Sequence, residues 1–225
     1  MKQIFACAGL AVAMLYGIGC ERNIFVKKES EQTYFPTQQE AANKAKSDLL
    51  AVLRSRKEIT LGLEEQTIEK SQPGAPIIQY QITFEDLLSA NTFATLNRNE
   101  LATVVPLVAD DTVATIVEVA KDESGWRVTS LANKSLSSEL DVVRKAAGPQ
   151  AGIVIYDLPH SGLKVYGVAQ PAGAEPSATL VYTNYTGFNL REGVPADRLL
   201  PVLKQDAAEF QRKYGDDLKN RKLVR

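Results

Sequence analysis

The feature that most constrains this chain is an uncharged apolar stretch near its beginning. Lys2 is followed by residues 4–18 (IFACAGLAVAMLYGI), which contain no charged side chain, and Glu21-Arg22 end the stretch. A helix needs about 20 apolar residues to span a bilayer, so this stretch is short for that purpose. A positive start, a short apolar region and small residues are typical of a cleaved signal sequence. We therefore expect residues 1–19 to be a signal peptide that takes no part in the folded domain.

The cysteines support this division of the chain. Both of them, Cys7 and Cys20, lie within or at the end of the export segment. The expected mature part therefore has no disulfide, no thiol nucleophile and no set of thiolates for a metal cluster.

Residues Gly17-Ile18-Gly19-Cys20 resemble the lipobox of bacterial lipoproteins, in which a small residue precedes the modified cysteine. Gly19 and Cys20 match this pattern, and Gly17 stands where the family normally has leucine. The resemblance implies that Cys20 carries fatty acyl chains such as palmitate and becomes the new N-terminus. It also implies a cell-envelope location, with Glu21 favouring the outer over the inner membrane of a Gram-negative cell. An ordinary cleaved signal and an uncleaved anchor are the alternatives.

Charge argues against a nucleic-acid partner. The chain has 26 basic and 27 acidic residues, and Lys2 is the only charged residue among residues 1–19. The expected mature part therefore has a net charge of −2, without the basic excess that neutralises phosphates.

Three segments of the mature chain have helical patterns. Residues 20–36 are polar and are expected to form a membrane tether, and the apolar and aromatic residues Ile24, Phe25, Tyr34 and Phe35 in this segment could dock on the domain. A helix is expected from Thr37, because Thr37 and Glu40 form a capping-box pattern before apolar residues at helical spacing. Similar spacing predicts helices over 135–147 and about 195–214.

The segments between these helices have β patterns separated by short polar turns. Strands are expected within 58–70, 76–84, 101–109, 112–121, 126–132, 152–157, 163–169 and 179–183, with a turn at 72–74 and a short helical turn at 84–90. Because the strands follow one another as hairpins, we predict an α+β fold with antiparallel sheet and an N-terminal, a middle and a C-terminal helix. The globular region is expected to cover 37–225, with two subdomains divided near 133–150 as an alternative to one.

His160 is the single histidine, and it lies in the hairpin-tip segment 157–162. Pairing with Ser161 as a catalytic base is unfavourable, because neighbouring side chains diverge in extended chain and the two atoms must approach to about 3 Å. We interpret His160 as a turn residue that could contact a ligand or partner.

Aromatic side chains form a second candidate contact. Tyr182, Tyr185 and Phe188 surround a turn, where they could form the lip of a ligand site or pack on the last helix. Trp126 follows a tight turn and is expected in the core or at its rim.

No cofactor or metal site is expected. The chain has no phosphate-binding glycine loop and no calcium loop, so the acidic pairs at 110–111, 122–123 and 216–217 are interpreted as solvated turns.

These observations favour an exported, lipid-anchored envelope protein with a non-enzymatic binding or structural role. Its partner would be another envelope protein or a glycan. One alternative is a carboxylate-based envelope hydrolase, since paired carboxylates are brought together by the fold and not by spacing; its candidates are Glu64, Glu65, Glu85, Asp86 and Glu118. Another alternative is a domain resembling protease inhibitors or propeptides, acting through loop 157–162 or 170–176.

Overall fold

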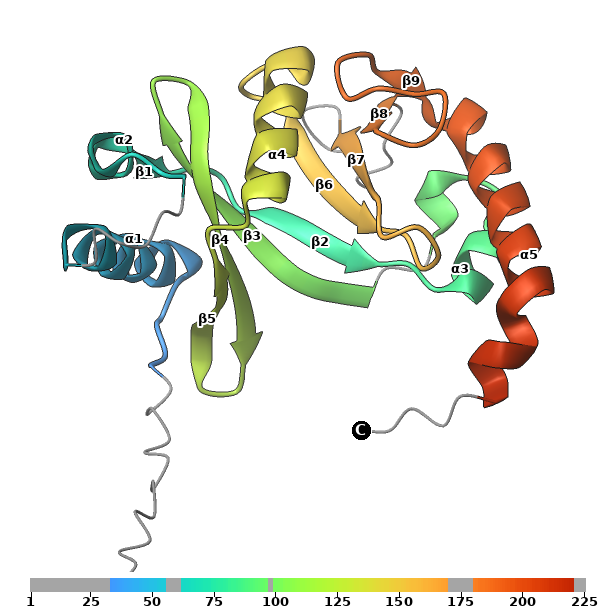
Figure 1. The fold of residues 1–225 in the computed structure, drawn as a ribbon, viewed down its shortest axis with the longest axis horizontal. Helices are drawn as coiled ribbons and strands as arrows, with labels where there is room; N and C mark the ends of the chain where they lie inside the picture. Colours follow the sequence, from blue (N-terminus) through green and yellow to red (C-terminus); the bar gives the residue numbers. More distant parts are fainter. Residues whose placement is uncertain (1–32, 56–61, 97–98, 170–179, 221–225) are drawn as a thin grey trace, which may run out of the picture. The chain divides into compact units, whose positions relative to one another are not determined.

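The computed structural model describes residues 33–55, 62–96, 99–169 and 180–220 (Figure 1). This part of the chain has a mixed α/β fold, with five α-helices and one largely antiparallel sheet of nine strands. The helices are α1 (Gln38–Ser55), α2 (Glu65–Lys70), α3 (Phe84–Ser89), α4 (Lys134–Ala147) and α5 (Ala196–Asn220), with a 3-10 turn, η1, at Phe93–Thr95. The strands are β1 (Gln72–Pro73), β2 (Ile77–Gln81), β3 (Asn99–Ala109), β4 (Thr112–Asp122), β5 (Gly125–Leu131), β6 (Gly152–Asp157), β7 (Lys164–Ala169), β8 (Leu180–Thr183) and β9 (Val194–Pro195).

The sheet joins the two halves of the chain through one parallel pair. Its order is β5-β4-β3-β2-β6-β7-β8-β9, and β1 pairs with β3 beside this path. The meander β3–β4–β5 and the hairpin β6–β7 are antiparallel, as the turn residues predicted. β2 and β6 run parallel to each other, which the prediction of an antiparallel sheet did not include. A parallel neighbour needs a long crossover, and the chain makes it through β3–β5 and α4.

The prediction of β structure within 58–70 is wrong for its described end, where Glu65–Lys70 form α2. Residues 58–61 lie outside the described residues. Arg54 of α1 binds the carboxylates of Glu65 and Glu69, at 2.6 and 2.9 Å, and Ile68 is buried. Contacts with α1 therefore stabilise a short helix whose sequence lacks a helical apolar period. The predicted turn at 72–74 is also different, because Gln72 and Pro73 form β1 on the edge of β3.

The ends of two predicted helices are confirmed by their caps. The Thr37 hydroxyl accepts a hydrogen bond of 3.2 Å from the backbone N–H of Glu40 at the start of α1. Asn133 caps α4 in the same way, accepting at 3.1 Å from the N–H of Leu136.

Helices cover both faces of the sheet. On β6, Ile155 belongs to the apolar cluster under α4, whereas the next residue, Tyr156, belongs to the cluster under α3 and α5. On β3, Val104 belongs to the α4 cluster and Val105 to the cluster under α1. Because successive side chains of a strand point to opposite faces, α4 covers one face, and α1, α3 and α5 cover the other.

The chain enters the sheet through a contact between Phe35 and Trp126 of β5. The two residues exchange backbone hydrogen bonds of 2.7 and 2.8 Å, so Phe35 covers the edge of β5 at this point. Gly125 allows this approach, since its φ is +129° and a Cβ there would lie 2.8 Å from the Phe35 carbonyl oxygen.

We therefore expect Gly125→Ala to decrease the free energy of unfolding by about 2–3 kcal/mol, from backbone strain and displacement of Phe35. Gly162→Ala is the control, because Gly162 also has a positive φ, +65°, but has open space around its Cβ position. That variant should lose only about 1 kcal/mol. Urea unfolding followed by the fluorescence of Trp126, the single tryptophan, measures both effects. Equal losses in the two variants would contradict a role for the Phe35 contact.

Candidate functional site

The structure brings two of the predicted contact residues together at the tip of the β6–β7 hairpin. His160 lies in this tip, and its Nε2 is 3.3 Å from the hydroxyl of Tyr185. That hydroxyl donates a hydrogen bond to Asp206 of α5. The three side chains therefore connect the hairpin, the chain after β8 and the C-terminal helix.

Aromatic rings surround His160 and determine its electrostatics. Its ring centroid lies 5.9 Å from that of Phe84 and 6.2 Å from that of Phe210. Burial lowers the pKa of His160 below its ordinary value of 6.5, because it disfavours the charged imidazolium, and the Asp206 carboxylate opposes this effect. The pKa of Tyr185 is raised, first by burial and then by its hydrogen bond to Asp206.

The contacts of this arrangement join separate elements of the fold. The hydroxyl of Ser161 accepts at 3.2 Å from the backbone N–H of Leu163, and no hydrogen bond joins Ser161 to His160 within the described residues. The Tyr185 hydroxyl is directed to Asp206 as a donor. In this arrangement His160 contributes to packing between the hairpin and α5.

The other predicted contact residues lie elsewhere. Tyr182 is 5% exposed and belongs to the cluster under α4, on the sheet face opposite Tyr185. Phe188 packs at the edge of the cluster under α5, and Trp126 packs with the cluster under α1. Tyr182, Tyr185 and Phe188 are close in sequence, but their side chains do not form one lip.

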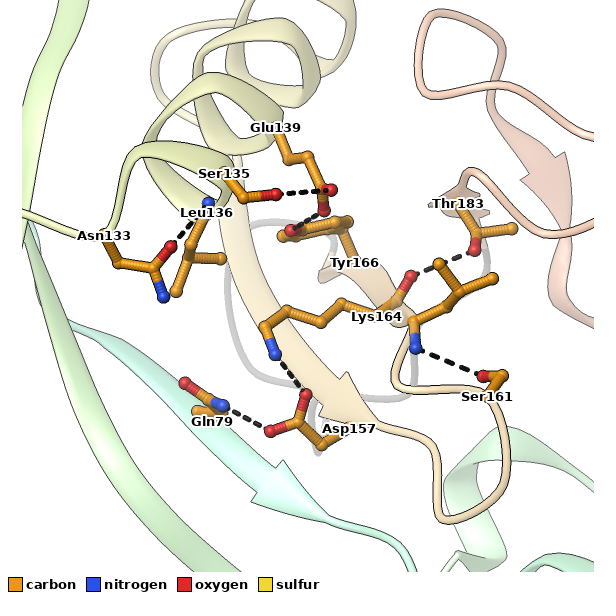
Figure 2. A network of polar contacts seen from close by, with 11 residues as sticks. Gln79, Asn133, Ser135, Leu136, Glu139, Asp157, Ser161, Lys164, Tyr166 and Thr183 are labelled. Atoms are coloured by element: carbon orange, nitrogen blue, oxygen red, sulfur yellow. Dashed lines mark hydrogen bonds and ion pairs between the residues drawn. The ribbon is translucent and has the colours of Figure 1, made fainter. Parts of the chain in front are cut away.

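A polar network joins the carboxyl end of β6 to β2 and to the amino end of β7 (Figure 2). Asp157, the last residue of β6, accepts hydrogen bonds from the Gln79 side chain and, at 2.5 Å, from Lys164. The exposed fractions of the Lys164 and Asp157 side chains are only 22% and 21%. The backbone continues the pairing, because the N–H of Ile82 donates at 3.0 Å to the carbonyl of Asp157. Hydrogen bonds therefore hold β2 to β6 at this end, and the Lys164–Asp157 ion pair holds β6 to β7.

The same network connects the sheet to α4. The hydroxyl of Tyr166, on β7, donates a hydrogen bond of 2.5 Å to Glu139 of α4. Figure 2 shows Glu139 extending from the helix toward the ring of Tyr166. Burial, and then the contact with Glu139, raises the pKa of Tyr166. Tyr166 therefore stays protonated and acts as a hydrogen-bond donor that positions α4.

The opposite ends of β2 and β6 diverge and border an open cavity of about 570 Å³. The parallel register covers Gln79–Gln81 opposite Ile155–Asp157 and includes no pair nearer the amino ends (Figure 1). We call this cavity the notch; its walls are residues 72–77 and 149–153, with Val108, Asp110, Asp111 and Arg144 around them.

Comparisons with protein-family models, curated protein sequences and solved structures give no match.

In the sequence, no motif marks the charged residues of the notch as a candidate site. Asp110 and Asp111 are predicted as a solvated turn, and they do form the two-residue turn between β3 and β4, with φ of 48° and 60°. Arg144 belongs to a predicted helix and lies in the last turn of α4. Asp206 is likewise one polar residue of a predicted helix. Only the long-range pairing of β2 with β6, and of α5 with the hairpin, gives these positions their surroundings.

Other acidic candidates have structural contacts. Glu65 pairs with Arg54, and Asp86 closes the capping box at the start of α3. Within the described residues, no group of three or more metal-ligating side chains lies close together. Over the same residues, no helix is both long and apolar enough to cross a membrane.

The single histidine allows a direct test of the His160 environment. Because its folded-state pKa is below that of the unfolded chain, its contribution to stability is present above about pH 6.5 and is lost as the pH falls through the folded-state pKa. The proton NMR titration of His160 should therefore have its midpoint below 6.5. His160→Gln should lose less stability than the unmodified protein between pH 7.5 and pH 5.5, as measured by urea unfolding. A titration midpoint above 6.5 would show that the Asp206 carboxylate raises the pKa of His160 by more than burial lowers it.

Proposed function

We propose that this chain is an exported, lipid-anchored cell-envelope protein whose α+β domain has a non-enzymatic binding role. The apolar segment 4–18 and the lipobox-like Gly17-Ile18-Gly19-Cys20 support export and acylation. Two or more acyl chains on Cys20 would anchor the protein stably, since each buried methylene contributes about 0.8 kcal/mol. The outer membrane is the favoured location in a Gram-negative cell.

The main support for a binding role is the notch. Its volume of about 570 Å³ lies within the range of small-ligand sites, roughly 300–1,000 Å³. Its walls have proline, alanine, isoleucine and valine side chains together with the charged side chains of Asp110, Asp111 and Arg144, and small-ligand sites likewise combine apolar walls with a few polar groups. The polar network at Asp157 holds the other end of the same strand pair, so the walls belong to a fixed framework.

The alternatives have less support from specific contacts. Loop 157–162 packs through His160 onto α3 and α5, and Leu158 in the same loop is 6% exposed, which does not suit a projecting inhibitory loop. Loop 170–176 lies outside the described residues. Among the carboxylates named for a hydrolase, Glu65 and Asp86 are bound to neighbouring helix groups. We therefore favour binding at the notch over either alternative.

The proposed anchor predicts a change of location on substitution of Cys20. Cys20→Ser should move the protein from the membrane to the soluble fraction of lysed cells, because the acylated thiol is removed. Cys7→Ser is the matched control and should leave the protein in the membrane fraction. An intact mass with Cys20 unmodified, or with Met1 retained, would contradict the lipoprotein assignment.

The proposed binding role can be tested in cells by site-specific photo-crosslinking. A photoreactive amino acid at the exposed wall residue Gln150 should form a reproducible adduct with a ligand or partner. The same probe at Ser124, in the exposed β4–β5 turn, serves as the control and should give none. Equal adducts at both positions, or none at Gln150, would contradict binding at the notch.

A further inference from the structure

The charges of the notch indicate which ligand it takes, and this inference rests on the binding role proposed above. Arg144 is the single cationic residue among those that line the notch. Its Nε is buried and has no hydrogen-bond partner, and no carboxylate forms an ion pair with it within the described residues. A position in the last turn of α4 suits a cation, because the helix dipole is negative there. The dipole does not, however, satisfy the directed N–H donors of a guanidinium.

An unpaired guanidinium at a cavity wall is suited to a planar anion. Arginine donates two parallel hydrogen bonds to a carboxylate or a phosphate, and such charge-assisted pairs are among the strongest hydrogen bonds in proteins. The side chain of the adjacent Lys145 does not line the notch, because it binds Asp141 at 2.6 Å. The cationic part of the notch therefore depends on Arg144 alone.

Asp110 and Asp111 favour a carboxylate over a phosphate as the anion that Arg144 binds. Both line the notch and are exposed, and neither forms an ion pair within the described residues. Positive φ at both positions of such a turn favours glycine, asparagine or aspartate, and the two aspartates here add negative charge to this side of the notch. Two carboxylates would repel a dianionic phosphate, but they attract an ammonium group or peptide N–H groups.

The walls of the notch also suit a peptide. Gly74, Ala75, Ala151 and Gly152 have small side chains or none and leave room along the walls, whereas Pro73, Pro76 and Pro149 have no backbone N–H to donate. Because β2 and β6 are paired only from Gln79 and Ile155 onward, their amino ends face the notch instead of each other. The N–H groups of Gly74 and Ala151 are already bound to the carbonyls of Pro106 and Gly148, so the charged side chains of the notch, and not main-chain pairing, select the ligand.

We propose that the notch binds a short peptide with a free carboxyl terminus. Its α-carboxylate binds Arg144, and its terminal ammonium group faces Asp110 and Asp111. The ligand is then of opposite charge at its two ends, matching the two sides of the notch.

Tri-alanine is the probe, and the full-length protein in detergent is the receptor. Saturation-transfer NMR and titration should show binding, and amidation of the peptide carboxylate should weaken it at least tenfold. Arg144→Gln should weaken binding of tri-alanine at least tenfold and make it indifferent to amidation. Lys145→Gln, the matched control on the same helix turn, should change the affinity less than twofold.

Asp110→Asn/Asp111→Asn tests the other side of the notch, because asparagine tolerates the same positive φ. This variant should bind tri-alanine more weakly but bind N-acetyl-tri-alanine as the unmodified protein does. Thermal unfolding checks that each variant is folded, and Arg144→Lys replaces Arg144→Gln if the latter does not fold.

Two outcomes separate this inference from the proposed function. If Gln150 forms its adduct in cells but tri-alanine binds equally well with and without amidation, or does not bind, the peptide assignment is overturned and the binding role stands. If neither the adduct nor peptide binding is observed, both are overturned.

Discussion

The parallel pairing of β2 with β6 is the constraint on which the rest of the fold depends. β2 belongs to the sheet portion built on β3–β5, and β6 to the portion built on β7–β9, so this pair makes them one sheet. Only Gln79–Gln81 pair with Ile155–Asp157, so the two strands are joined toward their carboxyl ends and lie apart at their amino ends. Asp157 closes the carboxyl end through Gln79 and Lys164, which lie on the strands at either side of β6. A half-buried carboxylate with two donors is favourable here, whereas either donor alone would leave part of its charge unsatisfied.

The local parts of this fold could be predicted from the sequence, because local patterns determine them. Asp110-Asp111 lies between two β-branched runs and forms the hairpin turn, and the Thr37 hydroxyl caps the first helix, as the capping-box pattern predicts. The parallel pair could not be predicted in this way. Gln79 and Ile155 are separated by three strands and two α-helices, and no pattern within either segment specifies the partner strand. The prediction of β structure over Glu65–Lys70 is wrong because contacts with α1, absent from any local window, determine the conformation of this segment.

The candidate sites show the same limit. His160 and Tyr185 stand out separately in the sequence as polar aromatic residues near turns, and the fold places them 3.3 Å apart with Asp206 as the third member. Asp206 carries no signal, since a single acid on the polar side of a helix has many equivalents. Arg144 carries none either, because basic residues are ordinary in the last turn of a helix. What distinguishes Arg144 is a buried Nε without a partner, and that property exists only once α4 is packed on the sheet.

The two outer edges of the sheet are short or covered, and this favours the notch as the position where a partner binds. Long exposed edges favour uncontrolled pairing between molecules, so natural sheets usually shorten or cover them. Here one outer strand, β9, has only two residues, and the other, β5, is covered by Phe35 at Trp126. The diverging ends of β2 and β6 lie inside the sheet order, three strands away from β5. A second copy of the sheet cannot easily reach an edge enclosed in this way, whereas a single short peptide can. The fold thus limits nonspecific pairing at its outer edges and leaves an inner edge for a ligand whose size and charge fit the notch.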